Sequence, residues 1–425
     1  MKNSLLIATI LCTFILTGQE TYLHCGKVLD VASGKILSEK TIVVEGNKIK
    51  SIENGYTQPN TEITVVDLKN KVVLPGLIDM HVHIEGQSSP QTYIQRFTQN
   101  EADVALQSTV YAKNTLMAGF TTVRDLGGSG VNIALRKAIN KGSVVGPRIF
   151  TAGKAIGTTG GHADPTNGMR KDLMGNPGPK EGVVNSPEDG KKAVRQRYKD
   201  GADVIKITAT GGVLSVAKSG QNPQFTLEEI KAITDTAKDY NMLTAAHAHG
   251  DEGMQRAVKG GIKTIEHGTL MSEETMDLMV EYDAYLVPTI TAGKQVTEKA
   301  KIPGYFPAVV AQKASEIGPL IQGTFSKAYK KGVPIAFGTD AGVFPHGENA
   351  REFGYMVEAG MPALKAIQSA TITNAKLLGM GENLGQIKES YLADIIAVEA
   401  NPLEEVSTLE KVFFVMKEGE IFKSE

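Results

Sequence analysis

Eight short apolar segments, each followed by a helical pattern, constrain the fold of this chain more than any other feature. Between residues 77 and 342 they read LIDMHVHI, TTVRDLGG, PRIFTAG, DVIKITATGG, LTAAHAHG, TIEHGT, YLVPTI and IAFGTDAG. Strands that alternate with helices pair in parallel, because each helix carries the chain back across the sheet. Eight such units predict an α/β fold with a closed (β/α)8 barrel. A doubly wound open sheet is the alternative, but its usual phosphate-binding glycine fingerprint is absent after the early strands.

The helices between these segments have recognisable starts and ends. Ser186 and Pro187 predict the start of a helix before DGKKAVRQRYKDG. Thr226 and Glu229 form a capping box ahead of IKAITDTAKDY. Glycines end four helices just before the next strand, at positions 119, 201, 260 and 332.

Both ends of the chain read as β-structure. Strand-like runs separated by glycine turns occupy residues 21–73, and a similar pattern begins near residue 385. We therefore expect a small β-sandwich domain built from both chain ends beside the barrel. The expected boundaries are 19–73 and 381–425 for the two parts of the sandwich and 74–380 for the barrel.

The first eighteen residues resemble a secretory signal peptide. Lys2 is followed by an apolar run from Leu5 to Leu16, which is too short to span a bilayer. An internal first strand is the alternative reading. We expect residues 1–18 to be removed and the protein to be exported, periplasmic or secreted, without stable membrane association afterwards. The mature chain would then hold one cysteine, Cys25, so an internal disulfide is excluded.

The charge pattern argues against a nucleic-acid partner. The 45 basic and 47 acidic residues are interspersed and give a formal net charge of -2. A protein that binds nucleic acid usually shows a basic stripe or patch, and this sequence has none. We therefore expect a small molecule or a short peptide as the partner.

Polar side chains gather where the predicted strands end, which is where barrel enzymes place their active sites. His81 and His83 lie two residues apart, so both side chains point to the same face of a strand. Further polar residues occupy later strand ends or the loops beyond them: His162, Lys206, His247, His249, His267 and Asp340. Singly, a histidine there is explained by a hydrogen bond to a carbonyl, and Asp340 by a helix cap. Histidines converging from several strands favour a metal site instead.

Lys206 is the hardest of these residues to explain by a structural role. It lies in the middle of DVIKIT, a strand expected to be buried on both faces. An unpaired ammonium group is costly there and would be expelled or neutralised. This residue therefore calls for a chemical explanation.

Five motifs of this chain, LPGLIDMHVH, IKIT, HAHG, IEHG and GTDAG, resemble the amidohydrolase superfamily. The resemblance covers nearly the whole chain after the expected signal peptide. In binuclear members it implies His81 and His83 as ligands of a first metal and His247 and His267 as ligands of a second. It also implies a carboxylated Lys206 that bridges both metals, and Asp340 on the first metal. Carboxylation would turn a buried cation into an anionic oxygen ligand.

The resemblance also implies a mechanism. Mixed nitrogen and oxygen ligands suit Zn²⁺, while ligand type alone leaves Mn²⁺, Co²⁺ and Fe²⁺ open. Two metals that share a hydroxide lower its pKa and make it the nucleophile. Asp340 would then act as general base and pass the proton to the leaving nitrogen as general acid.

The finer motifs TTVRDLGG, TTGGHAD, TATGGV, VPT and EFGYMVEAGM resemble the branch of Xaa-Pro dipeptidases and metallocarboxypeptidases, which also resembles imidazolonepropionase. Related deaminases usually carry a glutamate where this chain has Gly250. We predict hydrolysis of a dipeptide or of a short C-terminal peptide bond. A cyclic-amide or lactone hydrolase is the alternative, and a non-catalytic interaction protein ranks below it.

A peptide substrate brings an α-carboxylate, which needs a cationic or donor-rich partner. Arg124, His162 and His249 are the candidates for substrate binding. For Arg124, an ion pair with Asp125 or with a neighbouring strand is an equally good interpretation. The resemblance further implies a homo-oligomer.

Overall fold

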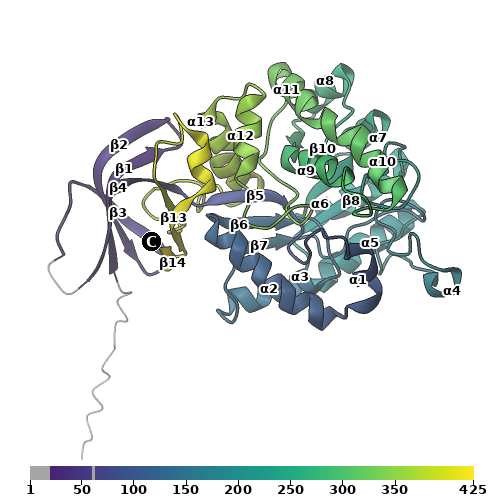
Figure 1. Ribbon diagram of the computed structural model, residues 1–425, viewed down its shortest axis with the longest axis horizontal. Coiled ribbons are helices and arrows are strands. Elements are labelled where there is room, and N and C mark those ends of the chain that lie inside the picture. Colours follow the sequence, from purple (N-terminus) through teal and green to yellow (C-terminus); the bar gives the residue numbers. More distant parts are fainter. Residues whose placement is uncertain (1–19, 60–62) are drawn as a thin grey trace, which may run out of the picture.

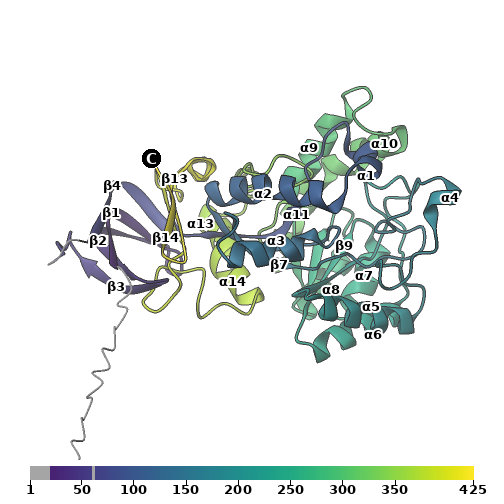
Figure 2. The same cartoon turned by 90° about the horizontal axis from the view of Figure 1, so that it is seen from below.

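The computed structural model describes residues 20–59 and 63–425, and in this part the chain has an α/β fold (Figure 1). The expected signal peptide, residues 1–18, lies outside the described residues. Figure 2 shows the arrangement from below, with a β-rich region at one end and most of the helices at the other.

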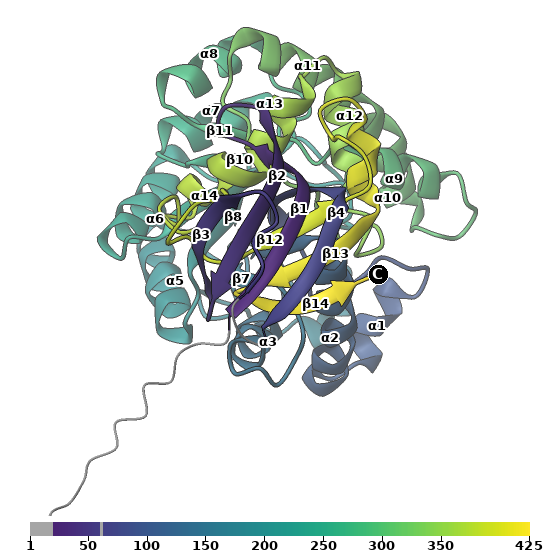
Figure 3. The same ribbon diagram turned by 90° about the vertical axis from the view of Figure 1, so that its left-hand side faces the viewer.

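Strands from both ends of the chain form one mixed sheet of seven strands, in the order β14-β13-β12-β4-β1-β2-β3 (Figure 3). The strands are β1 (Glu20–Asp30), β2 (Lys35–Glu45), β3 (Lys48–Asn54), β4 (Thr64–Pro75), β12 (Ile395–Val398), β13 (Val412–Lys417) and β14 (Glu420–Ser424). β4 pairs in parallel with β1 and antiparallel with β12. The two chain ends therefore share one sheet, whereas the expected division into a sandwich stays a proposal.

Seven of the eight predicted barrel segments are parallel strands. One sheet contains β5 (Leu77–Val82), β6 (Phe120–Asp125) and β7 (Arg148–Thr151). The other contains β8 (Val204–Thr208), β9 (Leu243–Ala248), β10 (Thr264–His267) and β11 (Tyr285–Val287). A single bridge between Ile156 and Ile207 links the two sheets.

The eighth predicted segment is not a continuous strand. Residues 335–342 make one bridge at each end, between Leu286 and Ile335 and between Val82 and Ala341. Asp340 has a φ of 62°, in the left-handed region, which interrupts the extended backbone that a ladder requires. The hydrogen-bonded ladder around the parallel strands is therefore discontinuous at this segment.

Helices follow the parallel strands as the sequence predicts. Their bounds are α1 (Thr92–Thr98), α2 (Glu101–Met117), α3 (Val131–Asn140), α4 (Lys171–Met174), α5 (Pro187–Asp200), α6 (Leu227–Asp239), α7 (Asp251–Lys259), α8 (Glu273–Glu281), α9 (Ile290–Ala300), α10 (Ala308–Ile317), α11 (Ile321–Lys331), α12 (Arg351–Glu358), α13 (Ala363–Gln368) and α14 (Asn374–Leu377). The Ser186 hydroxyl caps α5, and Thr226 and Glu229 form both bonds of the capping box of α6. None of the helices in the described part is long and apolar enough to cross a membrane.

Candidate metal centre

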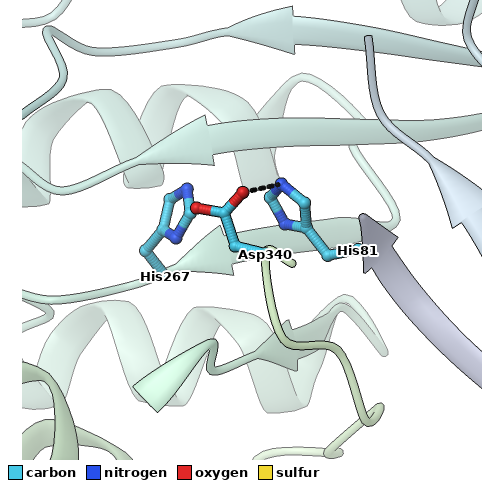
Figure 4. Close-up of side chains that lie close together, drawn as sticks. All are labelled: His81, His267 and Asp340. Atoms are coloured by element: carbon cyan, nitrogen blue, oxygen red, sulfur yellow. Dashed lines mark ion pairs between the residues drawn. The ribbon is translucent and has the colours of Figure 1, made fainter. Parts of the chain in front are cut away.

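His81, His267 and Asp340 meet at one point above the parallel strands (Figure 4). Each is buried and offers one ligand atom, and these atoms lie within 4.8 Å of one another. His81 Nε2 lies 3.5 Å from Asp340 Oδ1, and His83 Nε2 lies 3.3 Å from the same oxygen. The structure thus brings the two histidines of the first strand together with a histidine of the sixth and the aspartate of the eighth segment.

A second group of imidazoles adjoins His267. The ring centroid of His247 lies 4.7 Å from that of His267 and 4.3 Å from that of His162. His249 stacks on His267 at 5.0 Å. His267 therefore contacts both groups, and the histidines form one continuous cluster.

Lys206 lies beneath this cluster on β8. Its neighbours Ile205 and Ile207 belong to the main hydrophobic core, so strand alternation turns Lys206 to the opposite face. The residue is 4% exposed and lines the same cavity as the histidines. Among the described residues its Nζ has no hydrogen-bond or ion-pair partner. Burial lowers the pKa of Lys206 to about 8, which favours the neutral amine that carboxylation requires.

The Nδ1 atoms of three of these histidines are held by neighbouring oxygens. His83 Nδ1 lies 2.7 Å from the carbonyl oxygen of Gly127, and His267 Nδ1 lies 2.7 Å from the hydroxyl of Thr289. His249 Nδ1 lies 2.9 Å from the hydroxyl of Thr269. Such contacts orient an imidazole and leave Nε2 free to bind a ligand.

Glu266 lies beside His81 and is a residue of the site region that the sequence interpretation missed. Its Oε2 lies 2.8 Å from His81 Nδ1, and its Oε1 accepts a hydrogen bond of 2.9 Å from Arg124 Nη2. Both side chains of the Arg124 and Glu266 ion pair are fully buried. The sequence did contain a signal for Glu266, because a carboxylate is unusual inside the strand motif TIEH. It is as unusual there as Lys206 is in DVIKIT.

Arg124 is not placed where a substrate could reach it. Besides Glu266, its guanidinium donates to the carbonyl oxygen of Met80 at 2.6 Å and to the hydroxyl of Thr264 at 3.1 Å. It is 0% exposed and does not line the cavity, unlike His162 and His249. This placement argues against substrate contact by Arg124 and fits its alternative role as a partner of a neighbouring strand.

Three residues of the site have left-handed backbone conformations. The φ values are 72° for His267, 62° for Asp340 and 51° for Thr289. Each such non-glycine residue costs about 1 to 3 kcal/mol. His267 and Asp340 are candidate metal ligands, and Thr289 contacts Nδ1 of His267.

The cluster forms the floor of a cavity of about 640 Å³. This volume is within the usual range for small-molecule sites. The floor is polar, while much of the wall is apolar and consists of Val213, Leu214, Val296, Ile317, Ile321 and Val343. The cavity can therefore hold a small molecule with an apolar part against a polar reacting group.

The electrostatics of the cluster fit metal ions. Burial lowers the pKa of His83 to about 4 and holds the pKa values of His81, His247 and His267 well below the usual value, so these imidazoles are neutral at pH 7. Neutral imidazole is the form that binds a metal. Asp340 Oδ1 is buried without a hydrogen-bond partner among the described residues, and burial raises the pKa of this carboxyl to about 8. A bound cation would supply the missing partner and hold the carboxylate ionised.

Neutral imidazoles and a buried carboxyl group at the carboxyl ends of parallel strands, on the floor of an open cavity, are the arrangement expected of a metal-dependent hydrolase with an α/β fold. Comparison with known proteins gives the family. Residues 72–422 match the amidohydrolase family, and the chain belongs to it.

Relatives of this chain are hydrolytic enzymes. The chain is 33% identical to ochratoxinase of Aspergillus niger over 408 residues, which are 91% of this chain and 82% of that protein. The crystal structure of a Xaa-Pro dipeptidase with methionine bound in its active site is similar with 54% identity and a TM-score of 0.93, over 96% of this chain and 100% of that one. A prolidase complexed with N-methylphosphonate-L-proline is similar with 31% identity and a TM-score of 0.86, with the same coverage. The protein is therefore a hydrolase.

Proposed function

We propose that this protein hydrolyses the amide bond at the amino group of a C-terminal amino acid, as a metal-dependent dipeptidase or short-peptide carboxypeptidase. The observation that carries the proposal is the convergence of His81, His83, His267 and Asp340 on the floor of one cavity. The reaction adds water to the carbonyl carbon, breaks the C–N bond and releases a carboxylate and an amine.

The residues that would hold two divalent metals are His81, His83, Lys206, His247, His267 and Asp340. Zn²⁺ is the metal that we expect. Bound metals of this kind supply an activated water near neutral pH and polarise the scissile carbonyl. A carboxylated Lys206 fits its buried position, its lowered pKa and its lack of a partner among the described residues.

Asp340 is the residue that we assign to proton transfer. Its Oδ1 lies within 3.5 Å of two imidazole Nε2 atoms, and its buried setting raises its affinity for a proton. The carboxylate would accept a proton from the attacking water and deliver it to the leaving nitrogen. His162 and His249 line the cavity and remain the candidates for contact with the substrate.

The substrate class follows from the cavity wall. Val296, Ile317 and Ile321 provide an apolar surface for the side chain of the released amino acid. The relatives support this assignment, since one binds methionine and another, a prolidase, binds N-methylphosphonate-L-proline. We therefore propose an apolar C-terminal residue as the preferred substrate.

We also propose that the parallel strands close into a (β/α)8 barrel. The single bridges at Ile156, Ile335 and Ala341 join neighbouring strand edges in the order that a closed (β/α)8 barrel requires. We further propose a β-sandwich from both chain ends, an exported location and a homo-oligomer. The apolar run from Leu5 to Leu16 is the support for export.

The test combines metal analysis with substrate profiling on the purified protein. We expect about two divalent metals per chain and cleavage of dipeptides or N-acyl amino acids that end in methionine, proline or phenylalanine. Two metals with cleavage of cyclic amides or lactones alone would refute the peptide assignment and keep the metal centre. A protein without stoichiometric metal after growth and purification in zinc would refute the metal-dependent mechanism.

A further inference from the structure

A second cavity, of about 500 Å³, adjoins the main one. His83, Leu214 and Val343 line both cavities. The other walls of the second cavity come from residues 86–99, which include α1, and from Val104, Phe306 and Gly342. Of the candidate metal ligands, His83 therefore lies where the two cavities meet.

The junction is held in place by hydrogen bonds. The hydroxyl of Tyr93 on α1 donates to the carbonyl oxygen of Leu214 at 2.8 Å. Lys299 Nζ on α9 donates to the carbonyl oxygen of Val343 at 2.7 Å. The side chain of His83 between them is 37% exposed, whereas that of His81 is 1% exposed. A molecule bound at His83 can thus reach both cavities.

Both cavities are largely apolar, and they differ in their polar side chains. The main cavity holds the histidines, Lys206 and Asp340, whereas the second adds the amides of Gln87, Gln95 and Gln99 and the rings of Tyr93 and Phe306 to its apolar lining. In the described chain the side-chain amides of Gln95 and Gln99 make no hydrogen bond, so they are free to bind a ligand.

The charge of the second cavity selects against an ammonium group. Among the described residues, no aspartate or glutamate lines it. Arg96, a cationic side chain in its lining, already donates to the carbonyl oxygens of Pro165 at 2.7 Å and Asn167 at 3.2 Å. A free α-ammonium group would meet the like charge of Arg96 there and gain no carboxylate partner from the described lining residues. A neutral acyl group would gain amide donors and aromatic surface instead.

We propose that the second cavity binds the acyl side of the scissile bond and that the enzyme prefers N-acylated amino acids, or the C-terminal bond of longer peptides, to dipeptides with a free amino terminus. This inference rests on the proposed amide hydrolysis and specifies its substrate. Water adds to the acyl carbon, the C–N bond breaks, and the amine that takes up the proton leaves through the main cavity.

The experiment compares substrates that share a C-terminal methionine, using the metal-loaded enzyme. The three substrates are N-acetylmethionine, N-benzoylglycylmethionine and the dipeptide Gly-Met. We expect kcat/KM to be about tenfold or more higher for the benzoylglycyl substrate than for the acetyl substrate, and lowest for Gly-Met.

Two variants locate this preference. Val104→Trp narrows the second cavity and should lower the ratio of benzoylglycyl to acetyl kcat/KM by about tenfold. Val110→Trp is the matched control, because it lies on the same helix outside the cavity and is 55% exposed; it should leave the ratio unchanged. Gln95→Glu places a carboxylate in the cavity and should raise kcat/KM for Gly-Met relative to N-acetylmethionine.

The outcomes separate the two proposals. A wild-type enzyme that cleaves none of the three substrates refutes the proposed amide hydrolysis, and the acyl subsite falls with it. A wild-type enzyme that cleaves them while Val104→Trp and Gln95→Glu leave both ratios unchanged keeps the hydrolysis and overturns the subsite. If Val104→Trp fails to fold, Gln95→Glu tests the acyl subsite alone, through the ratio of kcat/KM for Gly-Met to that for N-acetylmethionine.

Discussion

Removal of the buried cation beneath the metal centre tests whether Arg124 positions Glu266 or binds substrate. We consider Arg124→Met, which keeps an unbranched apolar side chain and deletes the guanidinium. The change removes three hydrogen bonds, to Met80, Thr264 and Glu266, and leaves the Glu266 carboxylate buried without its cation.

The expected loss of stability follows from these contacts. The two bonds to neutral oxygens are worth about 1 kcal/mol each, and the bond to a carboxylate is worth about 2 to 3 kcal/mol. Breaking a buried ion pair by removing one partner costs about 3 to 5 kcal/mol. We therefore expect Arg124→Met to lower the free energy of unfolding by about 4 kcal/mol. The double variant with Glu266→Gln should be less destabilised than Arg124→Met alone, because no lone buried charge remains.

The assay is urea unfolding of metal-free protein, so that metal binding does not add to the measured stability. Circular dichroism suits this chain, which has no tryptophan. Metal titration should also show weaker binding, by about tenfold or more, because Glu266 would no longer hold His81. Unfolding within about 1 kcal/mol of wild type, together with a raised KM, would refute the positioning role and return Arg124 to the substrate site.

Two further variants test the site, and a third tests Glu352, a buried carboxyl group on α12 that accepts hydrogen bonds from Ile290 N and Thr291 N. Asp340→Asn should lower kcat by about 10² to 10⁴ with metal content retained, and a rate within tenfold of wild type would exclude its role in proton transfer. Lys206→Ala should lose metal on elemental analysis and regain part of it with propionate, whereas full metal content would exclude the bridge. Burial raises the pKa of Glu352 to about 7, above the value of 4.5 expected in the unfolded chain, so its contribution to stability falls as pH rises between these values. Glu352 should contribute a drop of up to about 1.4 kcal/mol per pH unit to the wild-type unfolding free energy there. Glu352→Gln should lack that contribution, and a slope equal to that of wild type in urea unfolding would contradict the assignment.

Local spacing explains why most of the parallel strands were predictable. A strand places residues two apart on one face, so the sequence around His81 and His83 already fixes how these imidazoles point. The caps of α5 and α6 depend on residues three apart and were equally accessible. The break near Asp340 was not, because a left-handed backbone at an aspartate has no reliable sequence signature.

Contacts between distant residues explain what the sequence left open. Arg124 and Glu266 lie 142 positions apart, so neither could be assigned as the other's partner from local pattern. The shared sheet of the two chain ends depends on β4 pairing with β12, about 320 positions later. The two stretches at the chain ends, residues 19–73 and 381–425, each predict strands, but neither pattern predicts which strands of one stretch pair with those of the other.

The place of β4 between β1 and β12 has a consequence for biosynthesis. Until synthesis reaches the last 30 or so residues, one edge of β4 has no partner, and an unpaired strand edge invites association with other chains. The nascent protein would expose this edge through most of its synthesis, since long-range pairing forms late. Pairing of β12 with β4 completes the sheet that holds strands from both chain ends. We therefore expect a chain truncated before residue 395 to aggregate rather than to form a smaller active enzyme.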